Sequence, residues 1–299
     1  RAVIDGLSLM LTDKANRTVF EQMAKKAKFA ADDRIKHRAE RDVAKAASDS
    51  DGLTLIGKLA PCSGKNPDMN ELFIVEGDSA GGTAKQARVR QYQSILPLRG
   101  KPLNVQKKTA LQALQNEEIK TLVSAIGAGF NRSFEVDKSK YKKVIILSDA
   151  DQDGMHIRCI LLTFFFKYMR DLVNAGCVYI GMPPLYKVYK KDKVEYAYDD
   201  KELDEKIKKV GKGYQLQRYK GLGEMSADQL WDTTMNPATR NLTQVTIEDA
   251  TEAADVIEML MGDKVDGRKE FLAQNANFNK VDGFIDRVRF KPETDGEDY

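Results

Sequence analysis

The chain carries an apolar run that ends in three alternating carboxylates, with the sequence Val144-Ile145-Ile146-Leu147-Ser148-Asp149-Ala150-Asp151-Gln152-Asp153-Gly154. A second apolar run, residues 72–75, likewise ends in an acid, Glu76. Alternate residues of an extended chain point to the same side, so the three aspartates repel one another unless the chain turns or a cation lies among them. A hard divalent ion such as Mg2+ relieves that repulsion. Two acidic strand ends therefore predict one metal site.

The pattern around these runs predicts the fold class. Apolar strands at 72–75, 144–147 and 178–182 alternate with helical stretches at about 107–126 and 157–173. Buried strands that alternate with helices are typical of a parallel sheet flanked by helices, with ligands at the carboxyl ends of the strands. We expect an α/β fold with a Rossmann-like parallel sheet.

The remaining sequence predicts the segments on either side of this unit. Residues 14–47 are rich in Ala, Lys and Arg, with apolar residues at intervals of three to four, which predicts a long amphipathic helix. Beyond Pro183-Pro184, charged helices mix with short strands at 195–198 and 214–218. We predict a helical lead-in and linker at 1–52, a metal-binding domain at 53–186 and a mixed α+β tail domain at 187–299.

Composition bounds the class of protein. The 299 residues are 42% hydrophobic, enough for a full core, and no apolar run is long enough to cross a bilayer. The amino terminus has neither an initiator Met nor the apolar core of a signal peptide, so we expect a cytosolic piece of a longer chain. Three scattered cysteines without CxxC spacing argue against a disulfide framework or a zinc site.

Local charge is more informative than the net charge of +3. One stretch holds seven cations and no acid: Lys85, Arg88, Arg90, Arg99, Lys101, Lys107 and Lys108. A basic stretch that follows the Glu76 turn favours a polyanionic substrate.

Two other interpretations of the acidic and glycine-rich turns fit less well. The turn at 77–82 has neither GxGxxG nor GxxxxGK[ST] spacing, so dinucleotide and P-loop binding are not supported. The DxDxDG run resembles the start of an EF-hand loop, but its twelfth position is Ile160 rather than Glu. A solvated acidic turn remains open, although the second acid-bearing turn favours a shared site.

Five motifs in order resemble the B subunit of bacterial type IIA DNA topoisomerases. They are Glu76-Gly77-Asp78-Ser79-Ala80-Gly81-Gly82, Pro97-Leu98-Arg99-Gly100-Lys101, Asp149-Ala150-Asp151-Gln152-Asp153-Gly154, Pro183-Pro184-Leu185-Tyr186 and Arg218-Tyr219-Lys220-Gly221-Leu222-Gly223-Glu224-Met225. The resemblance covers about residues 50–290 and implies a TOPRIM domain followed by the B-subunit tail.

The resemblance also implies roles for individual residues. Glu76 and Asp149 would hold one Mg2+ at the scissile phosphate, Asp149 and Asp151 a second, and Asp153 would orient the cluster or join it. Mn2+ or Ca2+ can substitute. Glu76 is the candidate general acid and base for the 3'-oxygen. The positions implied to contact DNA are Arg99, Lys101, Asn104, His156 and Lys220.

Partners follow from the same resemblance. The nucleophilic tyrosine of the family belongs to the A subunit, so this chain alone should not cleave DNA. We expect double-stranded DNA and an A2B2 heterotetramer in the bacterial cytoplasm at the nucleoid, with no membrane association. ATP would bind only in domains that precede this region. Fluoroquinolone-type inhibitors would bind near residues 99–104.

The sequence leaves the particular enzyme open. Lys65-Asn66-Pro67, Tyr168-Met169-Arg170, Val178-Tyr179-Ile180 and Glu195-Tyr196-Ala197-Tyr198 look more like topoisomerase IV than gyrase, which favours relaxation and decatenation in chromosome segregation over negative supercoiling. A TOPRIM nuclease or primase is a second hypothesis. A non-catalytic DNA-binding scaffold whose acids tether an ion is a third.

Overall fold

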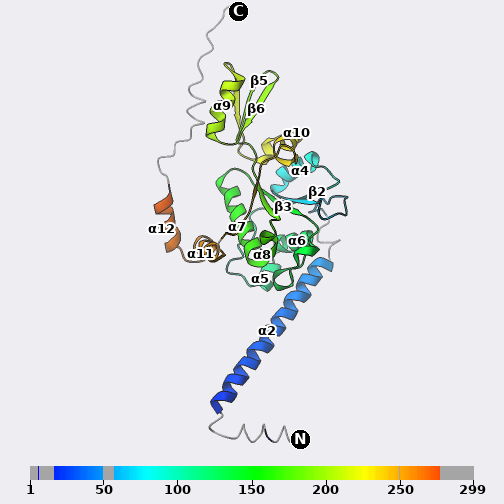
Figure 1. The fold of residues 1–299 in the computed structure, drawn as a ribbon, viewed down its shortest axis with the longest axis vertical. Helices are drawn as coiled ribbons and strands as arrows, with labels where there is room; N and C mark the ends of the chain where they lie inside the picture. The colour runs from blue at the N-terminus through cyan, green and yellow to red at the C-terminus, as the bar shows by residue number, and fades with distance from the viewer. Residues whose placement is uncertain (1–5, 7–16, 50–56, 249, 277–299) are drawn as a thin grey trace, which may run out of the picture.

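A five-stranded sheet forms the centre of the chain (Figure 1). The computed structural model describes residue 6 and residues 17–49, 57–248 and 250–276. The strand order is β2-β1-β3-β4-β8. The first four strands are parallel and β8 runs antiparallel to β4. The bounds are β1 Glu71–Glu76, β2 Gln93–Leu98, β3 Lys143–Leu147, β4 Val178–Gly181 and β8 Leu242–Gln244.

Helices cover both faces of this sheet, which explains why its central strands are apolar without interruption. Leu72 and Ile74 point to one face, where they pack with α5 (Ala110–Leu114), α6 (Glu117–Ile126), α7 (Gln152–Tyr168) and α8 (Arg170–Asn174). Phe73 and Val75 point to the other face, toward α4 (Gly77–Ala87), η4 (Leu222–Glu224) and α10 (Ala227–Leu230). The predicted α/β class with a helix-flanked parallel sheet is confirmed.

Several element boundaries differ from the sequence predictions. The predicted helix at 107–126 is two helices, because Asn116 accepts backbone N–H groups and starts α6 anew. The predicted helix at 157–173 begins earlier, at Gln152, and is interrupted at Met169. Strand β2 was not predicted, and it contains Pro97, a residue that is unfavourable in a central strand. The structure accommodates Pro97 because β2 is the edge strand of the sheet.

The predicted amino-terminal helix is present as α2 (Arg17–Asp49), which extends away from the sheet (Figure 1). It lies against α5 and α6 at one end. Its apolar side chains Val19, Met23 and Ile35 are exposed, so the predicted apolar stripe is not buried in this chain. Residues 1–5, 7–16 and 50–52 of the predicted lead-in lie outside the described residues.

A smaller antiparallel sheet follows, in the order β6-β5-β7, with α9 (Asp200–Val210) packed on it. Its strands are β5 Tyr186–Lys190, β6 Lys193–Ala197 and β7 Gln215–Arg218. The predicted strands at 195–198 and 214–218 correspond to β6 and β7, whereas β5 was missed. The chain then returns to the large sheet through α10, η5 (Trp231–Met235) and β8. The last described elements are α11 (Ala250–Met261) and α12 (Asp266–Asn275).

Two observations bear on the expectations from composition. All three cysteines, Cys62, Cys159 and Cys177, carry free thiols. Among the described residues, none of the helices combines the length and the apolar character that crossing a bilayer requires.

A buried ion pair joins the returning segment to the first strand. Both terminal nitrogens of Arg240 donate to the carboxylate of Glu71, at 2.5 and 2.7 Å. The exposed fractions of the two side chains are 4% and 7%. Gln93 also donates to Glu71, at 3.1 Å. Lys143 Nζ lies 3.7 Å from the same carboxylate. Because the Arg240–Glu71 pair is almost dry, loss of Arg240 would remove the two shortest of these contacts to a buried charge.

We expect Arg240→Met to lower the free energy of unfolding by about 3 kcal/mol, because Glu71 then lacks its main partner. Urea unfolding measures the change. Arg132→Met is the matched control, since Arg132 forms an exposed ion pair with Asp33 and should cost less than about 1 kcal/mol. Equal effects of the two substitutions would contradict the assigned role of the buried pair.

Candidate metal and nucleic-acid site

The two acidic strand ends meet at one edge of the large sheet. Strands β1 and β3 are adjacent and parallel, with Val75 opposite Leu147, so the chain leaves both strands side by side. The Asp149 N–H donates to Glu76 Oε2 at 3.1 Å. Both side chains are half-buried. The structure therefore brings together the two residues that the sequence predicts as central.

Glu76 and Asp151 each stand at the start of a helix. Helix α4 begins directly after Glu76, and Gly77 permits the turn with a φ of 78°. Helix α7 begins after Asp151, whose Oδ1 accepts the Gly154 N–H at 2.8 Å. Helix amino termini carry partial positive charge, which favours acids at these positions.

Gly154 allows α7 to start this close to β3. A Cβ at position 154 would lie 2.2 Å from the backbone oxygen of Asp149 and 2.8 Å from its nitrogen. Backbone atoms cannot move aside as a flexible side chain can. The glycine that ends the DxDxDG run is therefore needed to keep the Asp149 turn compact.

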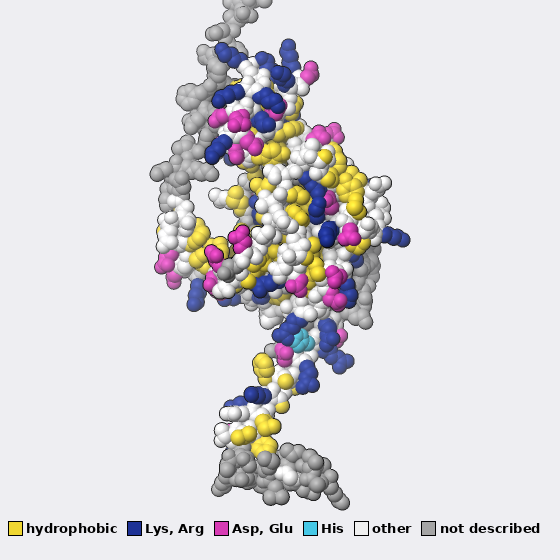
Figure 2. Space-filling model, in the orientation of Figure 1, with side chains coloured by type: hydrophobic (Ala, Val, Ile, Leu, Met, Phe, Trp, Pro, Cys, Tyr) yellow, Lys and Arg dark blue, Asp and Glu magenta, His cyan; other side chains and the backbone are white. Residues whose placement is uncertain are grey.

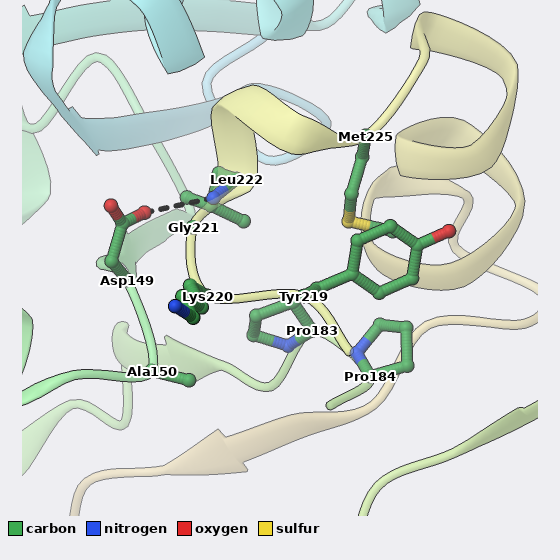
Figure 3. Close-up of a pocket in the computed structure, with 9 residues that line it drawn as sticks. All are labelled: Asp149, Ala150, Pro183, Pro184, Tyr219, Lys220, Gly221, Leu222 and Met225. Atoms are coloured by element: carbon green, nitrogen blue, oxygen red, sulfur yellow. Dashed lines mark hydrogen bonds between the residues drawn. The ribbon is translucent and has the colours of Figure 1, made fainter. Parts of the chain in front are cut away.

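The tail forms a third wall of the site, in addition to the ends of β1 and β3, and the sequence analysis did not predict it. The Leu222 N–H donates to Asp149 Oδ1 at 2.9 Å, and Gly221 lies beside the same carboxylate (Figure 3). A small pocket beside these residues is also lined by Pro183, Pro184 and Tyr219. The only sequence signal was the motif around Gly221, which does not by itself indicate contact with an acid.

Burial and mutual repulsion act on the two central carboxyls. Burial raises the pKa of Glu76, and the charges of Asp149, Asp151 and Asp153 raise it further against the hydrogen bond from Asp149. Burial also raises the pKa of Asp149, with a contribution from Asp151, although the Leu222 hydrogen bond lowers it. Both carboxylates are thus destabilised in a way that a bound cation would relieve.

The other two aspartates are occupied within the chain. Asp151 caps α7, and Asp153 accepts a hydrogen bond from Lys101 Nζ at 2.7 Å, which lowers the pKa of Asp153. Among the described residues, no three His, Cys, Asp or Glu side chains are arranged so that they could hold a metal ion. The Glu76–Asp149 pair has the hard oxygen donors that Mg2+ prefers, and Asp151 and Asp153 stay predicted members of the set.

The predicted DNA-contacting residues fall into two groups. Arg99, Lys101, His156 and Lys220 are exposed around the acids, and Arg99 forms an ion pair with Asp78 at 3.3 Å. Asn104 differs, because its amide donates to the Met261 backbone oxygen at 2.9 Å and its oxygen accepts the Gln106 N–H. The structure thus uses Asn104 to fasten its loop to α11.

A second set of hydrogen bonds holds the same loop, residues 104–107, against α11. Glu258 on α11 accepts hydrogen bonds from Gln106 at 2.7 Å and from Lys107 at 2.5 Å. Residues 104–107 are therefore fixed by the tail. The local sequence does not predict this contact. Arg158 was also missed, although it donates to Ser148 Oγ at 3.2 Å beside the site.

Comparison with known proteins identifies the class of domain first. The Toprim domain family matches residues 71–182, the part that holds the large sheet and the acidic strand ends. The family described as the carboxyl terminus of the DNA gyrase B subunit matches residues 211–273.

Individual relatives then identify the larger protein group. The chain is 48% identical to the B subunit of DNA topoisomerase 4 from Bacillus subtilis over 269 residues, which is 88% of this chain and 41% of that protein. It is 56% identical to the Streptococcus pneumoniae counterpart, over 75% of this chain and 35% of that protein. It is 55% identical to the B subunit of DNA gyrase from Archaeoglobus fulgidus, over 73% of this chain and 34% of that protein.

The chain spans about two fifths or less of the length of these relatives. Relatives named as topoisomerase 4 and as gyrase match similarly well. The chain is thus the Toprim and carboxyl-terminal region of a type IIA topoisomerase B subunit. The choice between the two enzymes is not made by these matches.

We expect Gly221→Ala to weaken Mg2+ binding, because the added Cβ would lie 2.6 Å from Asp149 Oδ2 and displace that carboxylate. The Mg2+-dependent rise in melting temperature measures the effect. Gly82→Ala is the control, since a Cβ there meets nothing within 4 Å. An unchanged Mg2+ response in Gly221→Ala would contradict this account of the third wall.

We expect Asp149→Asn to raise the melting temperature of the metal-free protein at pH 7. Folding raises the pKa of the Asp149 carboxyl. The free energy of unfolding of the wild type therefore falls as pH rises from the pKa of the unfolded state through the pKa of the folded state. Asparagine does not ionise, so the variant avoids this loss. The gain should shrink toward about pH 4, near the ordinary pKa of aspartate.

Scanning calorimetry with EDTA, across that pH range, tests this linkage. Added Mg2+ should stabilise the wild type and not Asp149→Asn, which reverses their order. The exposed Asp68→Asn serves as the control and should change neither result. If Asp149→Asn is no more stable than the wild type in EDTA at pH 7, the linkage argument is wrong.

Proposed function

We propose that this chain supplies the metal-binding part of the DNA gate in a bacterial topoisomerase IV, acting with an A subunit to cleave and rejoin duplex DNA during ATP-dependent strand passage. The proposal is supported by the hydrogen bond from the Asp149 N–H to the Glu76 carboxylate, which joins the ends of the two strands that carry these half-buried acids. The exposed cations Arg99, Lys101 and Lys220 around them suit a phosphate backbone.

The proposed chemistry assigns distinct tasks to these side chains. Glu76, Asp149 and Asp151 would hold Mg2+, with Asp153 as an additional member of the set. When bound there, Mg2+ would supply charge neutralisation at the phosphate and stabilisation of the leaving 3'-oxygen. Glu76 would transfer a proton to and from that oxygen. Lys101 would leave its ion pair with Asp153 and bind a DNA phosphate in its place.

The partners are part of the same proposal. The attacking tyrosine would come from the A subunit, in an A2B2 assembly in the bacterial cytoplasm, and ATP would act in another part of the full-length B chain. Residues 53–186 and 187–299 would form the metal-binding and tail domains. Fluoroquinolone-type inhibitors would bind near residues 99–104, and His156 would contact the DNA backbone. Gyrase is the alternative, because both enzymes need the same site.

We expect Glu76→Ala in the full-length B chain, mixed with a matching A subunit, to reduce Mg2+-dependent cleavage by about 10^2- to 10^4-fold, the range for loss of a general acid or base. Quantification of linearised plasmid measures it. Glu135→Ala is the control, because Glu135 is an exposed acid paired with Lys138. Cleavage retained at the wild-type level by Glu76→Ala would remove the assigned role.

The same assay separates the alternatives. A nuclease or primase would produce strand breaks or primers without the A subunit. A scaffold would keep full partner activity after Asp149→Ala. Topoisomerase IV and gyrase differ in the A subunit that restores activity and in the product, which is decatenated in one case and negatively supercoiled in the other.

A further inference from the structure

The small sheet has one strongly basic end, here called the lysine tip. The turn between β5 and β6, the end of α9 and the following loop meet there, because Lys190 Nζ donates to the Lys212 backbone oxygen. Figure 2 shows Lys and Arg side chains gathered at this end of the molecule. Its cations are Lys190, Lys191, Lys193, Lys208, Lys209 and Lys212.

The charges of this unit are separated along its length. The acids near the tip are Asp192 and Glu195, and Glu195 is already paired with Lys206 and Lys209. Asp199, Asp200 and Glu202 lie at the opposite end of α9, and Asp204 and Glu205 lie midway along it. In the part of the chain that the structure describes, Lys191, Lys193, Lys208 and Lys212 form no ion pair. The tip therefore presents uncompensated positive charge.

Structural needs explain only part of this pattern. Lysines in the last turn of α9 favour the helix dipole, which accounts for Lys208 and Lys209. A lysine on an edge strand discourages aggregation, which accounts for Lys193 on β6. Neither reason applies to Lys191 and Lys212, which lie in turns.

The backbone at Lys191 provides a separate observation. Its φ is 49°, in the left-handed region where glycine or asparagine is favoured. Lys191 is the first of two residues that connect the paired Lys190 and Lys193 in a tight hairpin. A lysine at this position is less favourable for the turn than glycine, so its charge at the apex requires another explanation.

We propose that the lysine tip is a second DNA-binding surface, which contacts duplex phosphates away from the acidic site. The tip has ammonium groups and no arginine forks, which suits contact with the backbone without reading of sequence. The choice of duplex DNA as the polyanion rests on the proposed function, since that function already places DNA on this chain.

The test compares two triple variants of the full-length B chain that remove the same charge. Lys191→Gln, Lys193→Gln and Lys212→Gln alter the tip, whereas Lys65→Gln, Lys142→Gln and Lys201→Gln remove exposed lysines elsewhere. Affinity for a long linear duplex is measured by fluorescence anisotropy across a range of salt concentrations. Circular dichroism and melting temperature verify that both variants fold.

We expect only the tip variant to bind more weakly, with the plot of log K against log salt shallower by about 0.9 for each lysine that contacts a phosphate. A duplex too short to reach beyond the acidic site should bind both variants alike. An unchanged salt slope in the tip variant overturns the proposal. Normal DNA binding by the tip variant, together with a lost response to the A subunit, also overturns it. Asp149→Ala in the cleavage assay tests the proposed function separately, because the tip measurement needs no cleavage.

Discussion

The candidate site depends on one electrostatic constraint, the placement of two half-buried acids, Glu76 and Asp149, at the ends of neighbouring parallel strands. Pairing of β1 with β3 brings Glu76 to the backbone of Asp149. Half-burial of both groups is unfavourable without a cation, and their raised pKa values express that cost. The apolar strands of the sheet and the helices packed on its two faces supply the stability that offsets the cost of half-burying these acids.

The surroundings of this acid pair are built by distant parts of the chain. Gly154 lets α7 start against the Asp149 backbone, and Gly221 lets the tail reach the Asp149 carboxylate. Basic side chains enter from the loop after β2, where Lys101 meets Asp153 and Arg99 meets Asp78. Each cation is thus held close to the acids by an exposed ion pair, which is weak enough to exchange for a phosphate.

Sequence patterns predicted the fold class and the acid pair because both depend on short-range features. Continuous apolar strands indicate burial on both faces, and acids directly after such strands must lie at their carboxyl ends. Contacts between distant segments could not be predicted in this way. Strand β8 is a polar segment of three residues that becomes a strand only beside β4. The use of Asn104 to bind α11 and the Leu222 hydrogen bond to Asp149 likewise depend on tertiary structure.

The buried bridge between Glu71 and Arg240 has a consequence for biogenesis. Its partners are 169 positions apart, and β8, which covers the free edge of β4, follows Arg240 by two residues. Residues 71–182 are synthesised before these closing elements, so the nascent sheet has an open hydrogen-bonding edge and a buried acid that lacks its bidentate arginine partner. The interval between synthesis of β4 and synthesis of β8 is therefore the one in which this sheet has an unpaired edge strand that could pair wrongly.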